Sequence, residues 1–189
     1  MKGADSLTKV ECDALLQAAG SQGVLAIRDR MMLELAAWTG LRVSELAALR
    51  VDQVIDGGLA LPTLHLDRKQ TKRGKGGKLP LAEKLQGSLE SYVIWLRGWY
   101  EGDWLFPGYD GKHLSSRAIQ LRVKRLAANA GIRKKISPHS LRKFYVQRLI
   151  DQGLDVRSVM ELSRHSSLES LHCYLVVNEE AARAAVELI

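Results

Sequence analysis

The chain has 189 residues, 46% of them hydrophobic, which is enough to build one globular domain around a single core. Its 28 Lys and Arg residues against 21 Asp and Glu residues leave a formal net charge of +7, which favours an anionic partner such as nucleic acid. The two cysteines, Cys12 and Cys173, form no CxxC pair, which argues against a disulfide framework or zinc knuckle and indicates a reducing, cytosolic setting. No apolar run approaches the roughly 18 residues of a membrane span, and the first residues lack the apolar core of a signal peptide. We therefore expect one domain over residues 1–189.

Three helices are predicted in the first quarter of the chain. Thr8 and Glu11 have the spacing of a capping box, so a first helix begins there. Its apolar stripe consists of Val10, Leu15 and Leu16. A second helix repeats its apolar residues in steps of three and four, at Val24, Ile27, Met31, Leu35 and Trp38. The Thr39-Gly40 pair ends that helix, and a short third helix carries Arg42, Glu45, Leu46 and Leu49.

The pattern changes between residues 54 and 81, where alternating leucines predict strands of a small antiparallel sheet. The segment 71–78 is rich in Gly and Lys and predicts a basic, mobile turn. Helical periodicity returns at residues 81–96, and further helices are expected at 115–130, 138–152, 155–163, 167–175 and 178–188. Gly131 and Gly153 are the expected stops. The predicted fold is mainly α with a small antiparallel β-sheet, an α+β class.

Three segments carry residues suited to chemistry. In the first, TGLRVSEL at residues 39–46, Arg42 follows a glycine turn at the start of a helix, where a guanidinium can meet an anion. Glu45 lies three residues on, on the same helix face, and can hold that guanidinium in place. Taken alone, this segment is better explained by an ordinary surface ion pair.

The second segment is SPHSLRKF at residues 137–144. Pro138 suits a helix start, so His139 and Arg142 share one face a turn apart and can both donate to one phosphate. A solvated helix face would explain the same spacing.

In the third segment, His165 precedes Tyr174 by nine residues with a short helix between them. A lone Tyr is more often a core residue, because its ring buries well and its hydroxyl needs one partner. His172 and Cys173 are adjacent, point apart on a helix and have no second pair, which argues against zinc.

In this joint order the segments make the chain resemble the tyrosine recombinase, or phage integrase, family, from LTKVE at residues 7–11 to the terminal tyrosine. The resemblance covers essentially the whole chain and implies the catalytic-domain fold of that family. It places a catalytic lysine on the hairpin turn, for which four residues compete: Lys69, Lys72, Lys75 and Lys78. Counting back from Leu79-Pro80-Leu81, the match selects Lys72. The residues alone indicate only that one of these lysines reaches the DNA.

The resemblance implies a metal-free and nucleotide-independent reaction in which Tyr174 attacks a DNA phosphate. The implied catalytic set is Arg42, Lys72, His139, Arg142, His165 and Tyr174, with Tyr174 as the nucleophile and Glu45 in support. Charge that develops on the phosphate oxygens needs fixed donors, which the two guanidiniums and the imidazoles supply. His139 is the implied proton acceptor and Lys72 the implied general acid. Glu45 is expected to orient Arg42 and His139.

Further DNA contacts are expected from Arg73, Lys75, Lys78 and Arg164. Arg164 departs from the family pattern, because Gly usually precedes this histidine, although Arg occurs there in some members. Its charge is expected to contact DNA or to tune the site.

Double-stranded DNA is the expected partner, without a cofactor, a metal or a membrane. Further protomers are expected on the DNA in a tetrameric synapse, with docking by the last helix, about Glu179 to Ile189, whose apolar face can otherwise pack on its own domain. A bacterial or archaeal cytoplasm is the expected location, and the DNA-clamping N-terminal domain that family members commonly carry is expected to be absent from this chain. Two alternatives remain: DNA relaxation like that of type IB topoisomerases, and a catalytically decayed DNA-binding relative.

Overall fold

The computed structural model describes residues 5–21, 23, 25–70 and 76–171. The chain divides into two compact units, Met1–Tyr145 and Val146–Ile189. Each unit is described by itself below.

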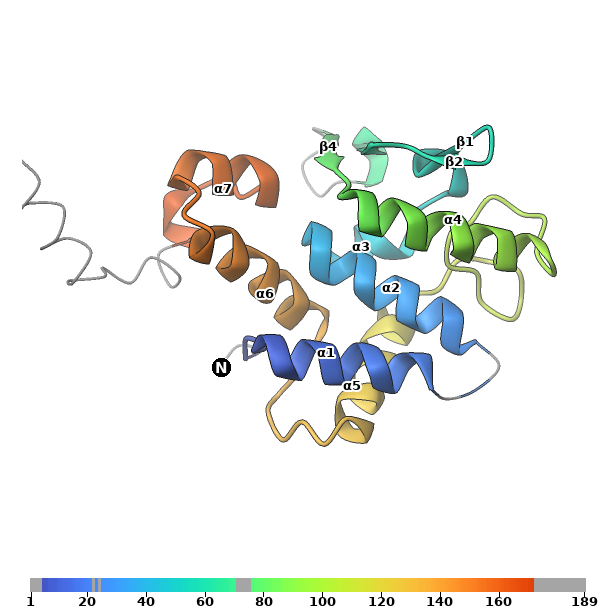
Figure 1. Cartoon of the computed structure of the whole chain (residues 1–189), viewed down its shortest axis with the longest axis horizontal. Helices are drawn as coiled ribbons and strands as arrows, with labels where there is room; N and C mark the ends of the chain where they lie inside the picture. Colours follow the sequence, from blue (N-terminus) through green and yellow to red (C-terminus); the bar gives the residue numbers. More distant parts are fainter. Residues whose placement is uncertain (1–4, 22, 24, 71–75, 172–189) are drawn as a thin grey trace, which may run out of the picture. The chain divides into compact units, whose positions relative to one another are not determined.

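The first unit is a set of helices packed around one hydrophobic core (Figure 1). Its helices are α1 (Lys9–Gly20), α2 (Ala26–Thr39), α3 (Val43–Ala47), α4 (Glu83–Arg97), α5 (Ser116–Asn129) and the first half of α6 (Pro138–Asp151). Helix α2 lies between α1 and α4, and α5 packs against α1 and α3. The predicted capping box is confirmed, because the Thr8 hydroxyl accepts from the Glu11 N–H and the Glu11 carboxylate accepts from the Thr8 N–H.

The predicted apolar stripes of α1 and α2 are partly wrong. Val10, Ile27 and Trp38 are 78%, 47% and 38% exposed, respectively. Because α1 and α4 cover α2 from two sides, its core residues surround most of the helix instead of forming one stripe. A single-face pattern underestimates such a central helix.

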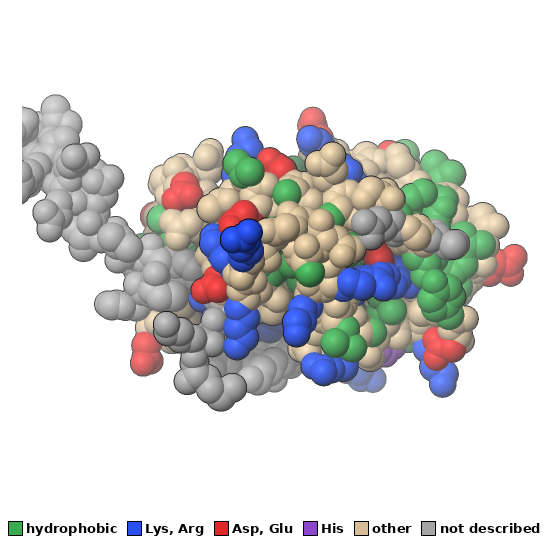
Figure 2. Space-filling view, turned by 90° about the horizontal axis from the view of Figure 1, so that it is seen from below, with side chains coloured by type: hydrophobic (Ala, Val, Ile, Leu, Met, Phe, Trp, Pro, Cys, Tyr) green, Lys and Arg blue, Asp and Glu red, His purple; other side chains and the backbone are tan. Residues whose placement is uncertain are grey.

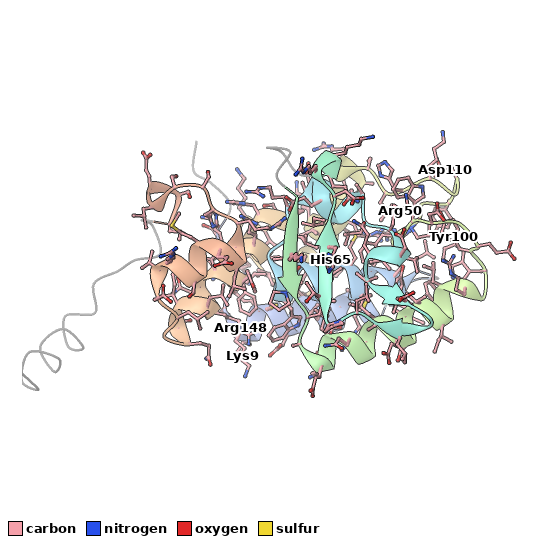
Figure 3. All side chains as sticks on the ribbon, turned by 90° about the horizontal axis from the view of Figure 1, so that it is seen from above. Lys9, Arg50, His65, Tyr100, Asp110 and Arg148 are labelled. Carbon is pink, nitrogen blue, oxygen red and sulfur yellow. The ribbon has the colours of Figure 1, made fainter. Side chains whose placement is uncertain are left out.

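The β structure forms two separate two-stranded antiparallel sheets where the sequence predicted one. Strand β1 (Ile55–Asp56) pairs with β2 (Leu59–Ala60), and β3 (Thr63–Leu66) pairs with β4 (Gly77–Pro80). Figure 3 shows β3 and β4 side by side, with His65 on β3. Short 3-10 turns, η1 (Val51–Gln53) and η2 (Arg68–Gln70), flank these strands. β3 and β4 thus flank the segment of the sequence that contains the competing lysines.

A buried ion network that sequence reasoning missed joins three parts of the first unit. Arg28 and Asp29 are each 1% exposed, and their side chains lie 2.9 Å apart. Arg28 also donates to the Pro107 carbonyl at 2.6 Å, and Arg122 of α5 contacts the same Asp29 at 3.2 Å. Buried charges are tolerated only when paired in this way. Burial, and secondarily the Asp29 charge, raises the pKa of neighbouring Tyr92 against the opposing effect of Arg28.

The second unit contains the rest of α6, then α7 (Val156–Ser163) and a 3-10 turn, η3 (Leu168–Ser170). Its small core gathers around Val146, Val159 and Leu171. The helix predicted at 167–175 is only this short turn within the described residues, and the helix predicted at 178–188 lies outside them. Among the residues described, no helix combines the length and apolar character needed to cross a membrane.

Gly40 and Gly131 are a matched pair of left-handed glycines, with φ of +62° and +71°. A Cβ on Gly40 would lie 2.4 Å from Cδ1 of Tyr145, whereas one on Gly131 meets nothing within 4 Å. We expect Gly131→Ala to cost about 1 kcal/mol for the left-handed backbone, and Gly40→Ala to cost roughly 1–3 kcal/mol more for overpacking. Urea unfolding of both variants measures the difference. Equal losses would contradict the close approach at Gly40.

Candidate active site

Arg42 and Glu45 form a fixed pair at the start of α3. The Glu45 carboxylate accepts from the Arg42 backbone N–H at 2.7 Å and from the Arg42 guanidinium at 3.0 Å. Glu45 is fully buried, whereas the Arg42 side chain remains 34% exposed. The predicted pairing is therefore present, and the buried acid holds a guanidinium that still faces solvent.

Arg142 of α6, near the end of the first unit in sequence, contacts the same turn. It is 4% exposed, and its Nη1 donates to the carbonyl of Gly40, two residues before Arg42. The left-handed Gly40 ends α2 and is overlaid by the Tyr145 ring, one turn of α6 beyond Arg142. The fold thus brings two predicted catalytic arginines, 100 residues apart in sequence, to one short segment.

His139 is the second residue of α6, after Pro138, and is exposed. Partial loss of hydration around its ring, and then the positive charges of Lys143 and Arg142, lower the pKa of His139. A lowered pKa keeps the imidazole neutral at pH 7, so that a ring nitrogen is available to accept a proton.

Lys72, Arg73 and Lys75 lie outside the described residues, so their predicted roles stay predictions. Lys69 is exposed on η2, and Lys78 is exposed on β4 opposite His65.

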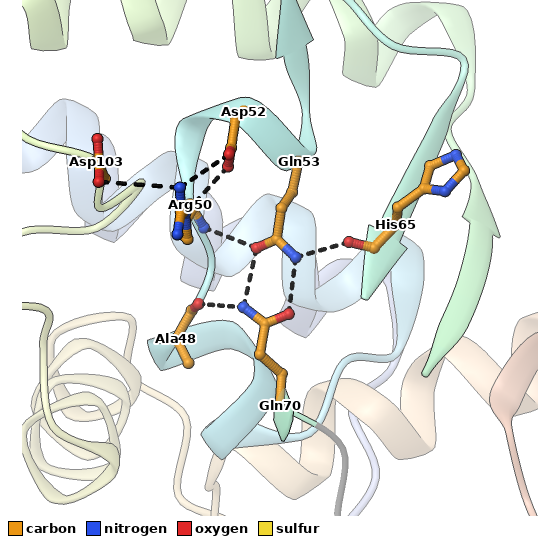
Figure 4. A network of polar contacts seen from close by, with 7 residues as sticks. All are labelled: Ala48, Arg50, Asp52, Gln53, His65, Gln70 and Asp103. Atoms are coloured by element: carbon orange, nitrogen blue, oxygen red, sulfur yellow. Dashed lines mark hydrogen bonds and ion pairs between the residues drawn. The ribbon is translucent and has the colours of Figure 1, made fainter. Parts of the chain in front are cut away.

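A pair of glutamines, Gln53 and Gln70, holds the end of η2 in place (Figure 4). The amides of Gln53 and Gln70 donate to each other's oxygens, at 2.7 Å and 2.9 Å. Gln70 also donates to the Ala48 carbonyl at 2.5 Å, immediately after α3, while Gln53 donates to the His65 carbonyl at 2.7 Å. Residue 70, two positions before Lys72, is therefore fastened to the segment that follows Arg42 and Glu45. Sequence reasoning missed this clamp, because isolated glutamines carry no spacing signal.

In the second unit, Arg164 and His165 end α7 with a Schellman motif. The Arg164 N–H donates to the Glu161 carbonyl at 3.1 Å, and the His165 N–H donates to the Met160 carbonyl at 3.0 Å. Arg164 has φ of +54°, a conformation that favours glycine. This geometry explains why glycine suits the position at which this chain carries Arg. Tyr174 lies outside the described residues.

Basic side chains extend beyond these motifs. Figure 2 views the side of α1 and α5, and Lys and Arg side chains gather across the middle of that face. Exposed basic residues of α5 and the following loop are Arg117, Lys124, Arg125, Arg133, Lys134 and Lys135. Among the described residues, no three His, Cys, Asp or Glu side chains cluster as metal ligands would.

The model of the Phage integrase family matches residues 5–181, and the chain belongs to this family. A tyrosine recombinase XerD of Pseudomonas aeruginosa is 37% identical over 177 residues, covering 89% of this chain and 56% of that protein. A XerD of Listeria monocytogenes is 32% identical over 190 residues, covering 94% of this chain and 61% of that protein. The chain thus spans little more than half the length of these relatives.

Solved structures share the fold. The XerA recombinase superposes with a TM-score of 0.77 at 24% identity, covering 99% of this chain and 66% of that one. XerH bound to its difH substrate gives 0.79 at 21% identity, covering 98% and 55%. The predicted family and fold class are confirmed.

The strain at Arg164 can be separated from the loss of its side chain by comparing two substitutions. Arg164→Gly and Arg164→Ala both remove the guanidinium, but only glycine tolerates a positive φ without penalty. We expect the glycine variant to be more stable than the alanine variant by about 1 kcal/mol. Hydrogen exchange at the His165 amide reports this cap. Equal protection in both variants would argue against a strained backbone.

Proposed function

We propose that the chain is the catalytic domain of a site-specific DNA recombinase that works through a covalent 3′-phosphotyrosine at Tyr174. The observation that carries this proposal is that Arg142 binds the Gly40 carbonyl, two residues before the Arg42 that Glu45 holds. Two positive groups held by backbone and by a buried carboxylate suit the oxygens of one phosphate. The similarity to XerD recombinases over most of the chain supports the same reaction class.

The proposed cleavage step transfers the phosphoryl group from a 5′ oxygen of DNA to the Tyr174 hydroxyl. The Tyr oxygen forms a bond to phosphorus, its proton passes to neutral His139, and the bond to the 5′ oxygen breaks. Lys72 supplies the proton that the departing 5′ hydroxyl takes up. Arg42, Arg142 and His165 stabilise the charge on the remaining oxygens. A 5′ hydroxyl from another strand reverses these steps and releases Tyr174.

This scheme needs neither a nucleotide nor a metal, because one phosphodiester is exchanged for another of similar energy. Glu45 does not touch the substrate; from its fully buried position it orients Arg42, and we propose that it also orients His139. We also propose phosphate contacts by Arg73, Lys75, Lys78 and Arg164, which would make binding strongly dependent on salt.

The proposed partners are double-stranded DNA and further protomers assembled on it, in a bacterial or archaeal cytoplasm. Structural neighbours include XerH bound to its difH substrate and a lambda integrase dimer bound to a core site. We propose a tetrameric synapse in which the last segment of the chain docks on a neighbour.

A nicked suicide duplex tests the chemistry. We expect wild-type chain to form a covalent protein–DNA band on a denaturing gel, and Tyr174→Phe to form none. Because no metal takes part, EDTA should leave the band unchanged. Tyr145→Phe is a matched control, since Tyr145 packs on Gly40.

The absence of a band with wild-type chain would favour a decayed DNA-binding relative. A band accompanied by plasmid relaxation, without exchange between two sites, would favour the topoisomerase alternative.

The lowered pKa of His139 predicts the pH dependence of cleavage. If neutral His139 accepts the Tyr174 proton, kcat/KM should fall as the pH is lowered, with a midpoint below the ordinary value of about 6.5. His139→Gln should be slower and should lose this acid limb. Persistence of the limb in His139→Gln would assign it to another group.

A further inference from the structure

The end of α7 holds a buried hydroxyl against the ring of His165. Ser163 is fully buried. Its Oγ lies 2.5 Å from the carbonyl oxygen of Val159 and 2.6 Å from Nδ1 of His165. Both distances are those of short hydrogen bonds, so the hydroxyl bonds both to the carbonyl and to the ring nitrogen.

The number of protons that each group can donate determines the direction of both hydrogen bonds. A carbonyl oxygen only accepts, and a serine hydroxyl has a single proton to give. If that proton pointed at Nδ1, two oxygen lone pairs would face each other at 2.5 Å between Ser163 and Val159. Both contacts become favourable only when Ser163 donates to Val159 and accepts a proton from Nδ1 of His165.

We propose that Ser163 is a positioning residue that locks His165 in the tautomer with its proton on Nδ1. Nε2 is then the ring nitrogen that carries no proton in the neutral ring. When the imidazole is neutral, Nε2 carries a lone pair. When the imidazole takes a second proton, the new N–H forms at Nε2 and can donate to a phosphate oxygen. The tautomer follows from the local contacts alone, whereas the consequence for the phosphate rests on the proposed recombinase function.

The backbone of His165 is fixed together with its ring. The Schellman bond from the His165 N–H to the Met160 carbonyl holds its main chain at the end of α7. The Ser163 contact in addition fixes the rotation of the imidazole ring relative to that main chain. Partners of this kind set which nitrogen of a histidine is protonated and where the other one points.

Nitrogen-15 NMR of the full chain, labelled at histidine, tests the tautomer directly. Long-range proton–nitrogen correlations show which ring nitrogen carries the proton, and His165→Gln assigns the signal among the five histidines. For neutral His165 in wild-type chain we expect the proton on Nδ1. In Ser163→Ala we expect that preference to be lost, and Ser163→Thr, which keeps a hydroxyl, should retain it. A wild-type proton on Nε2 would overturn the proposal, even if Ser163→Ala failed to fold.

Covalent-complex formation on the suicide duplex tests the catalytic consequence. We expect Ser163→Ala to slow it by about 10-fold or more, the range seen when such supporting bonds are removed, and Ser163→Thr to recover most of the rate. Ser158→Ala is the matched control on the same helix, because its hydroxyl contacts Asp155. In a His165→Gln background, Ser163→Ala should add no further loss, since both changes remove one interaction.

A purely structural serine would instead give additive losses and no rescue by threonine, which would overturn the catalytic consequence. Failure of wild-type chain to form the covalent complex would refute the proposed function, while the NMR result would still decide the tautomer.

Discussion

The contact between the Arg142 guanidinium and the Gly40 carbonyl holds the candidate site together. It joins α6 to the turn between α2 and α3, and that turn begins the segment in which buried Glu45 fixes Arg42. A charged donor on a backbone oxygen is a strong bond where water is excluded, and Arg142 is almost fully buried. The Tyr145 ring over Gly40 requires that no side chain occupy this position. The backbone of Gly40 is therefore held both by packing of the Tyr145 ring and by the charged bond from Arg142.

The charges around this contact are compatible with the phosphate chemistry proposed for the site. Within the described part of the first unit, Glu45 is buried and turned toward Arg42, so its charge positions that guanidinium. Partial loss of hydration, and then the charges of Lys143 and Arg142, lower the pKa of His139, which suits the proton-acceptor role proposed for it. The buried Arg28–Asp29–Arg122 network contributes separately, by fastening α2 to α5.

Local signals in the sequence predicted several elements well. The Thr8–Glu11 capping box places the start of α1 because its bonds close within four residues. Gly40, Gly131 and Gly153 all adopt positive φ where helices were expected to end. The exposure of Ile27 and Trp38 was not predictable, because it depends on which sides of α2 are covered by α1 and α4. The two small sheets also differ from the single one expected, since strand pairing depends on distant partners.

By itself, the sequence determined the family, the order of the motifs and the Arg42–Glu45 pair, because these depend on residue types at short spacing. Only the tertiary structure decided that Arg142 binds Gly40, that Gln53 clamps Gln70, and that Ser163 contacts His165. The first two contacts join residues 102 and 17 positions apart, and the third depends on a left-handed turn at Arg164. Hydrogen-bond partners of this kind are selected by where the folded backbone places donors and acceptors, which no local pattern encodes.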